Sequence, residues 1–186
     1  MIGRPRLHLR TTTSTNDRAR ELAAGGAPHG TLVTAGEQTA GRGRQGRAWI
    51  APAGSSLLLS LVLRETDPLL PLRAGLAVAD LAGPAALVKW PNDVLRDGRK
   101  VAGVLVEARP QEGWAALGIG VNAALDIHEM PRELRDTAGT LGRTDLEAAL
   151  SELLDHLPRP RPVRPGRRPP RLRRAAGRGG RAGRAG

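Results

Sequence analysis

The sequence predicts an α+β domain in which helices flank a mixed β-sheet. Patterns typical of strands dominate the middle of the chain, and the clearest helical patterns lie on either side of them. A length of 186 residues favours one compact domain. We expect that domain to span residues 1–157, because the composition changes abruptly after them.

The first predicted helix begins near Ser14. This side chain can cap the helix, with Asp17 three residues later in the position of a capping box. Residues 18–24 would form the helix itself. The pair Gly25-Gly26 would end it, because glycine favours the backbone conformation that follows a helix.

Short or alternating apolar runs predict the strands. Residues 31–35 form the first such run, and in residues 55–64 every second residue from Leu57 to Leu63 is leucine, which puts one apolar face on a strand. A helix is expected at residues 71–81. The remaining strands are expected at residues 87–90, 94–95, 100–107 and 115–121, with the turn Asp97-Gly98 joining the second and third of these as a two-residue hairpin.

The last predicted helix follows a capping box formed by Thr144 and Glu147. Six apolar residues then keep helical spacing as far as Leu157, which predicts an amphipathic helix. Pro, Gly and Arg make up 23 of the next 29 residues, 158–186. Such a composition cannot bury an apolar face, so we expect a disordered tail there.

The net charge of +11 comes from this tail. Residues 158–186 hold 11 Arg and no acid, which leaves 18 basic and 18 acidic residues in residues 1–157. A neutral body argues against a nucleic-acid-binding protein. That function stays an alternative only through non-specific contacts between the basic tail and phosphates.

The composition also excludes several kinds of site. Because the chain has no cysteine, it can form neither disulfides nor thiolate metal sites. Residues 1–9 lack the apolar core of a signal peptide, and no apolar run approaches the roughly 18 residues that span a membrane. We therefore expect a cytoplasmic protein that does not bind a membrane.

The densest group of potential ligand-binding side chains lies in residues 37–47. Its glycines let the backbone approach a ligand closely. Arg42, Arg44 and Arg47 are permanently charged donors suited to phosphate or carboxylate. The alternative is a solvated basic loop. Residues 41–46 also match G-x-G-x-x-G, but a leucine strand follows where a dinucleotide fold needs a helix, so the match is interpreted as accidental.

A second cluster joins a strand to a turn. Asn92 and Asp93 could hold a hydrated Mg²⁺ near phosphates, with Lys89 balancing the charge. The alternative is an ordinary Asn-Asp turn. Lys100 opens the strand that follows, and its own pattern predicts a side chain in solvent.

A third cluster lies at the end of the last predicted strand. The glycines of residues 118–122 indicate a bulge or a closely approaching ligand, because glycine otherwise weakens a strand. Asn122 ends the strand and offers both a donor and an acceptor.

Five motifs follow one another along the chain: Ser14-Thr15-Asn16; Gln38 with Gly41-Arg42-Gly43-Arg44-Gln45-Gly46-Arg47-Ala48-Trp49; Lys89-Trp90-Pro91-Asn92-Asp93; Arg99-Lys100-Val101-Ala102-Gly103; and Gly118-Ile119-Gly120-Val121-Asn122. In order and approximate spacing they resemble the biotin–protein ligase family, over about residues 11–157. The loop that carries Arg42, Arg44 and Arg47 is called the arginine loop below. Its combination with the Lys-Trp-Pro-Asn-Asp string is the most specific part of the resemblance.

The resemblance implies a mixed sheet flanked by helices, akin to class II aminoacyl-tRNA synthetases. It implies an enzyme that forms biotinyl-5′-AMP from biotin and ATP, with Mg²⁺, and passes biotin to a lysine of the biotin carboxyl carrier domain of a carboxylase. The implied catalytic residues are Lys100, Arg44 and Asp93. The implied biotin-binding residues are Ser14, Thr15, Asn16, Gln38, Arg42, Gly43, Arg44, Lys100, Gly103 and Gly118. ATP and the adenylate would meet Gly41, Arg42, Arg44, Arg47, Trp49, Lys89, Asn92 and Asn122, and Mg²⁺ would meet Asn92 and Asp93.

The chain departs from the family pattern at two places. Residues 75–89 are shorter than the usual helix and connection, so we expect a truncated or malformed helix there. The tail, residues 158–186, stands where the family carries a small β-barrel domain, and its composition resembles an out-of-frame translation of GC-rich DNA. An inactive ligase fragment is therefore an alternative to the active enzyme.

Two further expectations concern partners and relatives. Because the motifs begin by Ser14, we expect no helix-turn-helix before them and no specific DNA binding, and the chain is expected to be a monomer or a weak homodimer. Lipoate and octanoyl transferases share the implied sheet. They lack the arginine loop joined to Lys-Trp-Pro-Asn-Asp, which makes them a weaker alternative.

Overall fold

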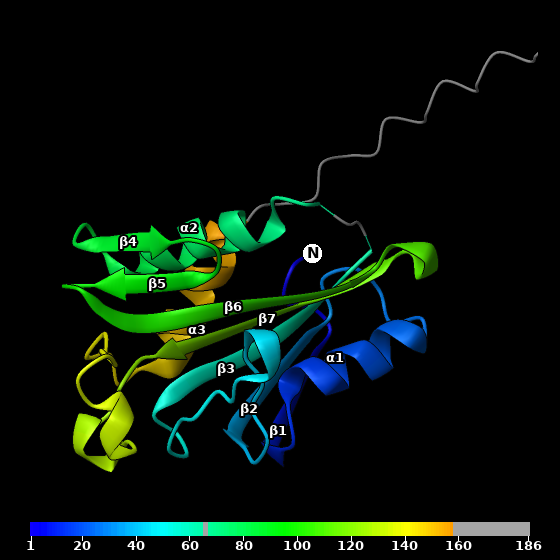
Figure 1. The fold of residues 1–186 in the computed structure, drawn as a ribbon. Coiled ribbons are helices and arrows are strands. Elements are labelled where there is room, and N and C mark those ends of the chain that lie inside the picture. Colours follow the sequence, from blue (N-terminus) through cyan, green and yellow to red (C-terminus); the bar gives the residue numbers. More distant parts are fainter. Residues whose placement is uncertain (65–66, 158–186) are drawn as a thin grey trace, which may run out of the picture.

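The fold is a seven-stranded mixed sheet, seen in a computed structural model that describes residues 1–64 and 67–157 (Figure 1). The strand order is β1-β2-β3-β7-β6-β5-β4. The strands are β1 (Arg6–Thr12), β2 (Leu32–Gln38), β3 (Ser56–Leu63), β4 (Ala86–Lys89), β5 (Asp93–Arg96), β6 (Arg99–Arg109) and β7 (Trp114–Asn122). Only the pair β1 and β2 is parallel among these, and the other neighbours are antiparallel. The predicted α+β class is confirmed, whereas the predicted tail lies outside the described residues.

Three α-helices cover the sheet in the described part of the chain. They are α1 (Thr15–Ala24), α2 (Leu70–Ala82) and α3 (Leu146–His156), and the short 3₁₀ turns are η1 (Arg44–Gly46), η2 (Pro110–Glu112), η3 (Ile127–Glu129) and η4 (Arg132–Leu134). Helix α1 packs on one face of the sheet, while α2 and α3 share the other (Figure 1). None of the described helices has the length and apolar character needed to cross a bilayer.

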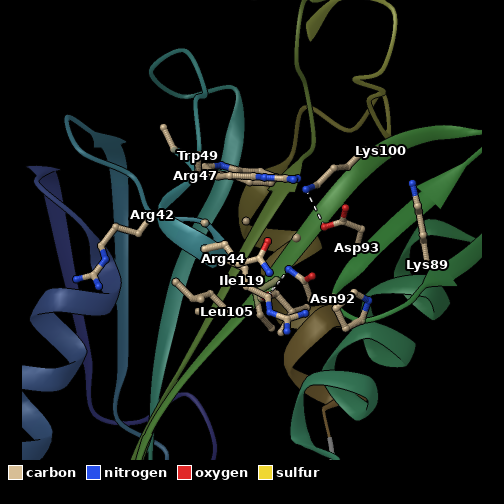
Figure 2. Close-up of a pocket in the computed structure, with 18 of the residues that line it drawn as sticks. Arg42, Arg44, Arg47, Trp49, Lys89, Asn92, Asp93, Lys100, Leu105 and Ile119 are labelled. Atoms are coloured by element: carbon tan, nitrogen blue, oxygen red, sulfur yellow. Dashed lines mark hydrogen bonds and ion pairs between the residues drawn. The ribbon is translucent and has the colours of Figure 1, made fainter.

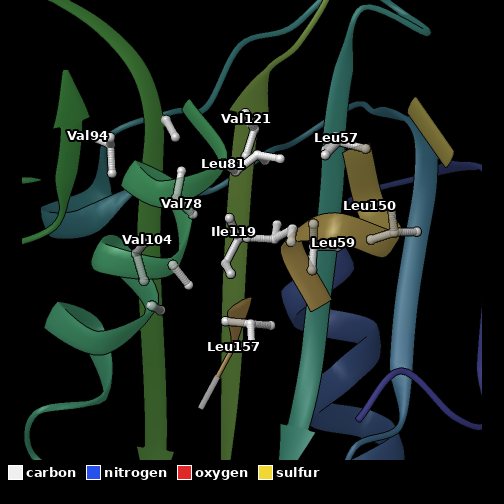
Figure 3. Close-up of a cluster of buried hydrophobic side chains, with 14 of the residues drawn as sticks. Leu57, Leu59, Val78, Leu81, Val94, Val104, Ile119, Val121, Leu150 and Leu157 are labelled. Atoms are coloured by element: carbon white, nitrogen blue, oxygen red, sulfur yellow. The ribbon is translucent and has the colours of Figure 1, made fainter. Parts of the chain in front are cut away.

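Strand β3 lies at the centre of both cores. Its residues are buried along the whole strand, because each face is covered by helices. Leu57 and Leu59 pack with α2 and α3 in the larger cluster, which also contains Ile119 of β7 (Figure 3). Val62 points to the opposite face and packs with Ala19 of α1. The predicted leucine face is thus confirmed, with a second buried face that the leucine pattern did not predict.

Strand β1 is absent from the sequence-based prediction. It lies at an edge of the sheet and most of its side chains are exposed, so no continuous apolar face marks it. Arg6 of β1 donates to both carboxylate oxygens of Glu147, at 2.6 and 2.7 Å. This hydrogen bonding lowers the pKa of Glu147 and raises the pKa of Arg6. The pair therefore ties the edge of the sheet to the first turn of α3.

Two predictions about the helices are wrong. The cap of α3 is Asp145, which accepts from Ala148 N at 2.9 Å, and not the predicted Thr144 with Glu147. Asp145 caps the helix because it is the residue directly before the first helical residue. Glu147 is already hydrogen-bonded to Arg6 of the edge strand β1. The helix that we expected to be truncated or malformed is regular from Leu70 to Ala82. It begins before residue 75, and Ala74 and its apolar neighbours pack against the sheet.

The helix cap and the hairpin turn predicted from the sequence are confirmed. Ser14 accepts from Asn16 N at 3.2 Å, and α1 ends at Gly25. Asp97 and Gly98 have φ values of 52° and 75°, as a two-residue hairpin requires. The register between β5 and β6 shifts next to this hairpin, because Val94 pairs with Ala102 and Leu95 with Lys100, which leaves Val101 of β6 as the extra residue. This shift determines the surroundings of Lys100.

Candidate functional site

One cavity of about 660 Å³ gathers the motifs that are far apart in the sequence. Residues from the start of α1, the end of β2, the arginine loop, the turn between β4 and β5, and strands β6 and β7 line it (Figure 2). A volume between roughly 300 and 1,000 Å³ is typical of small-molecule sites. Every site residue predicted from the sequence lines this cavity except Gly41 and Asn122.

The start of α1 supplies an ordered set of polar groups. Gln38 Oε1 accepts from both the backbone N and the hydroxyl of Thr15, at 2.7 and 3.0 Å. Ser60 Oγ lies 2.8 Å from Thr15 Oγ1 and 2.7 Å from Asn16 Oδ1. Ser14 caps the same turn. All of these groups except the half-buried Gln38 are buried, and they hold one another in place, so they form a preorganised polar end of the cavity.

Glycines make the floor of the cavity. A Cβ at Gly118 would overlap Asn16 Oδ1, so the amide of Asn16 lies directly on the β7 backbone. A Cβ at Gly120 would lie 2.5 Å from Cε2 of Trp49, and one at Gly103 would lie 3.1 Å from its Cζ3. The indole ring of Trp49 therefore rests on β6 and β7. Glycines within these strands mark close approach, as the sequence pattern indicated.

Gly41 explains why the loop can reach this floor. It does not line the cavity, but its Cβ would overlap the carbonyl oxygen of Trp49, and its own carbonyl accepts from Trp49 N at 2.9 Å. The indole Nε1 of Trp49 is buried without a hydrogen-bond partner in the described residues. That N–H is a donor available to a ligand or a water.

Lys100 points into the cavity, which corrects the expectation of a solvent-facing side chain. Its Nζ lies 2.7 Å from Asp93 Oδ1 and 5.7 Å from the centroid of the Trp49 ring (Figure 2). The register shift between Val94 and Leu95 pairs Leu95 with Lys100 and brings the two charged groups together. Lys100 is 38% exposed, so its charge remains accessible from the cavity.

The charge of the cavity wall is predominantly positive. Its charged lining residues are Arg42, Arg44, Arg47, Lys89, Lys100, Asp93 and Asp136. Five cations line the cavity against two anions. One of the five, Arg42, is paired with carboxylates outside the lining, and the remaining positive excess favours a ligand with several negative charges. The loop arginines are suited to planar anions, because guanidinium can donate two parallel hydrogen bonds.

Arg42 lies at the border of the cavity and is engaged by protein carboxylates. Its Nη1 donates to Asp17 Oδ1 at 2.5 Å and its Nη2 donates to Glu107 Oε1 at 2.9 Å. Figure 2 shows its side chain directed towards the helix α1 side, away from Lys100. The predicted contact of Arg42 with biotin and the adenylate stays a prediction.

Asn122 lies behind the cavity wall. Its Nδ2 donates to Gly139 O at 2.9 Å and to Lys100 O at 3.3 Å, and the side chain is buried. It therefore supports the backbone of Lys100 and the segment that follows β7. Its predicted role in holding the adenylate stays a prediction.

Sequence reasoning missed several residues of the site. The structure adds Ser60, Glu107, Leu134, Asp136 and Thr137. Ser60 and Glu107 are single polar residues within strands, and neither stands in a motif. Only the pairing of β3, β7 and β6 brings them near α1.

The described residues contain no group of three or more His, Asp or Glu side chains that could hold a metal ion. Asn92 Nδ2 donates to Val104 O at 3.0 Å, which leaves Asn92 Oδ1 as an acceptor. Asp93 keeps one carboxylate oxygen besides the one paired with Lys100. Two such oxygens fit a Mg²⁺ ion that retains waters and phosphate oxygens, as this ion usually does.

Comparison with known proteins identifies a single family. Residues 8–123 match the model of the Biotin/lipoate A/B protein ligase family. The bifunctional ligase/repressor BirA of Bacillus subtilis is 38% identical over 167 residues, which cover 83% of this chain and 50% of that protein. A biotin--[acetyl-CoA-carboxylase] ligase of Mycobacterium tuberculosis is 41% identical over 145 residues, covering 70% of this chain and 52% of that protein.

A solved structure has the same fold. The biotin protein ligase of Aquifex aeolicus in complex with biotin and ATP aligns with a TM-score of 0.71 and 32% identity, over 82% of this chain and 68% of that chain. The chain spans about half the length of the curated relatives it matches. The likeness therefore concerns the part of those proteins that aligns with the described sheet and helices.

Proposed function

Because the chain belongs to the Biotin/lipoate A/B protein ligase family, we propose that it activates biotin with ATP and transfers it to a lysine of a carrier protein. The domain proposed for this activity is residues 1–157, in the cytoplasm. The acceptor proposed is the biotin carrier domain of a carboxylase, since a relative is named a biotin--[acetyl-CoA-carboxylase] ligase. The Aquifex aeolicus neighbour binds biotin and ATP, which supports both as substrates.

The observation that carries the proposal is the meeting of cations and an ordered polar end in one cavity. Lys100, Arg44 and Arg47 line the same space as Ser14 and Asn16. A bicyclic urea such as biotin needs fixed donors and acceptors, which the start of α1 offers. A carboxylate and a triphosphate need positive charge, which the rest of the wall offers.

The first step brings two anions together. A biotin carboxylate oxygen attacks the α-phosphorus of ATP, forms a new O–P bond, and breaks the bond to the bridging oxygen, so pyrophosphate leaves. Lys100 and the loop arginines Arg44 and Arg47 offset the repulsion and the charge that builds in the transition state. No proton moves in this step, which agrees with a cavity that contains neither His nor Cys.

In the second step an acceptor lysine amine attacks the carbonyl carbon of the mixed anhydride. The C–N bond forms, the C–O bond to AMP breaks, and the amine loses a proton. Asp93 is the carboxylate beside Lys100 in the cavity, and we assign it the guidance of that proton. Residues of the loop from Arg42 to Ala48 line the cavity, and we assign this loop the exclusion of water from the reactive anhydride between the two steps.

Asn92 and Asp93 would hold the Mg²⁺ that accompanies ATP, through the oxygens left free by Val104 and Lys100. The ion would neutralise charge on the phosphates. Lys89, which lines the cavity next to these residues, adds a further positive charge on the same side.

Biotin-dependent exchange of labelled pyrophosphate into ATP tests the first step. We expect exchange with biotin and none with lipoate. Lys100→Ala and Arg44→Ala should each lower it by at least about 100-fold, because each removes a charge that acts in the transition state. Wild-type exchange in both variants would refute these roles. Transfer is tested by avidin detection of biotin on an added carrier domain, and exchange without transfer would limit the function to activation.

A further inference from the structure

We propose that Glu107 is a positioning residue that fixes the polar end of the cavity and fastens the arginine loop over it. The proposal rests on the proposed function for its meaning in the reaction, but its geometry stands apart from any ligand. Glu107 lies near the end of β6, outside every motif found in the sequence. Its two carboxylate oxygens serve two different parts of the site.

One oxygen orients Asn16. Glu107 Oε2 accepts from Asn16 Nδ2 at 2.9 Å, while Asn16 Oδ1 faces Ser60 Oγ at 2.7 Å. The amide of Asn16 is buried, so a rotated amide would place Oδ1 against the Glu107 carboxylate, where two acceptors would face each other without a hydrogen between them. Glu107 therefore determines that Oδ1, and not Nδ2, is the atom of this amide nearest to Gly118 at the floor of the cavity.

The other oxygen fastens the loop. Glu107 Oε1 accepts from Arg42 Nη2 at 2.9 Å, and Asp17 Oδ1 accepts from Arg42 Nη1. Arg20 lies within 3.5 Å of Glu107 and 3.3 Å of Asp17. Two cations and two anions thus form a balanced cluster of four residues. The cluster connects the loop to α1 and β6, which are parts of the rigid scaffold.

Arg42 stands at the entrance of the loop, in an isolated bridge with Ala48 at its exit. The backbone hydrogen bonds Gly43 N to Arg47 O and Trp49 N to Gly41 O close the same loop. A contact that holds Arg42 therefore holds the whole segment that carries Arg44 and Arg47. This arrangement leaves those two arginines available to an anion, since Arg42 is the one bound by protein carboxylates.

If the contacts of Glu107 had no role in the site, its substitution would change neither the loop nor the orientation of Asn16. Glu107→Gln keeps an amide oxygen for Asn16 and removes the negative charge that holds Arg42. Glu107→Ala removes both. Asp80→Asn, on the exposed side of α2 across the sheet, is the matched control because it also removes one negative charge.

The first measurement is hydrogen exchange of the ligand-free protein at the amides of Gly43 and Trp49. In Glu107→Gln both amides should exchange roughly fivefold faster, the effect of one partly exposed ion pair. Asp80→Asn should leave them unchanged. Unchanged exchange in Glu107→Gln would overturn the fastening of the loop, whether or not the protein binds biotin.

The second measurement separates the two roles. In Glu107→Gln the affinity for biotin should stay within about twofold, while the bound adenylate is released roughly fivefold faster. In Glu107→Ala the affinity should also fall by about tenfold or more, because a buried amide N–H loses its acceptor. Equal affinities in the two variants would overturn the positioning of Asn16. A wild-type protein that binds no biotin would sink the proposed function, while the exchange result still decides on the loop.

Discussion

A methyl group at Gly120 should displace Trp49 and open the cavity. The Cβ of Gly120→Ala would lie 2.5, 2.8 and 2.9 Å from Cε2, Cζ2 and Nε1 of the indole ring. Ordinary contacts between such atoms begin near roughly 3.5 Å, so the ring must move away by about 1 Å. The β7 backbone is paired on both sides and cannot yield, whereas Trp49 belongs to a loop.

The size of the effect follows from which part moves. Overpacking costs about 1–3 kcal/mol, and here the loop takes up the strain by leaving the sheet. The loss should appear as a decrease in affinity for biotin and ATP of roughly 5- to 150-fold, at about 1.4 kcal/mol for each tenfold change. Global stability should change little, because Trp49 lies outside the buried clusters of the sheet. Gly25→Ala, in ordinary contact only with Glu21 O and Leu22 O, is the control.

Two assays check this prediction. Calorimetry gives the affinities, and tryptophan emission, to which Trp49 contributes together with Trp90 and Trp114, reports a change at the indole ring. We expect a red shift in Gly120→Ala and none in the control. Wild-type affinity together with unchanged emission would show that Trp49 does not rest on Gly120, and the reasoning about the glycine floor would be wrong.

Two further predictions concern stability. The pKa of Glu147 is lowered by the hydrogen bond from Arg6, so its contribution is complete above the unfolded value of about 4.3 and is lost as the pH falls through the lower folded value. Glu147→Gln should thus cost about 0.5 kcal/mol in urea unfolding near pH 7 and nothing near pH 2, and a cost independent of pH would refute the pairing. Leu153 is 0% exposed in the core, so Leu153→Ala should lower the free energy of unfolding by about 2–5 kcal/mol, while Leu76→Ala on the exposed side of α2 should cost under about 0.5 kcal/mol. Similar losses in the two leucine variants would contradict the assigned core.

The sequence predicted those elements whose signal is local. The leucine alternation of β3 gave a strand because every second side chain meets the same core, and Asp97-Gly98 gave a hairpin because both residues adopt positive φ. Strand β1 escaped prediction because an exposed edge strand needs no apolar face. Its identity depends on pairing with β2, which is a non-local contact.

The site likewise has features with a local sequence signal and features that depend on distant contacts. The motifs predicted which residues line the cavity, because their residue types and order are those of the family. They did not predict that Lys100 faces Asp93, since this depends on a register shift between β5 and β6. Glu107 was missed because a single acid in a strand has no local signature. Its role depends on hydrogen bonds with Asn16 and Arg42, which are distant in the sequence.

The central claim is that one positively charged cavity holds the biotin carboxylate and the α-phosphate of ATP together. Titration calorimetry of this chain with biotin, in the presence and absence of ATP and Mg²⁺, tests it most directly. The account predicts micromolar or tighter binding of biotin alone, and tighter apparent binding of biotin when ATP and Mg²⁺ are present. Absence of biotin binding under both conditions would contradict it and favour an inactive ligase fragment.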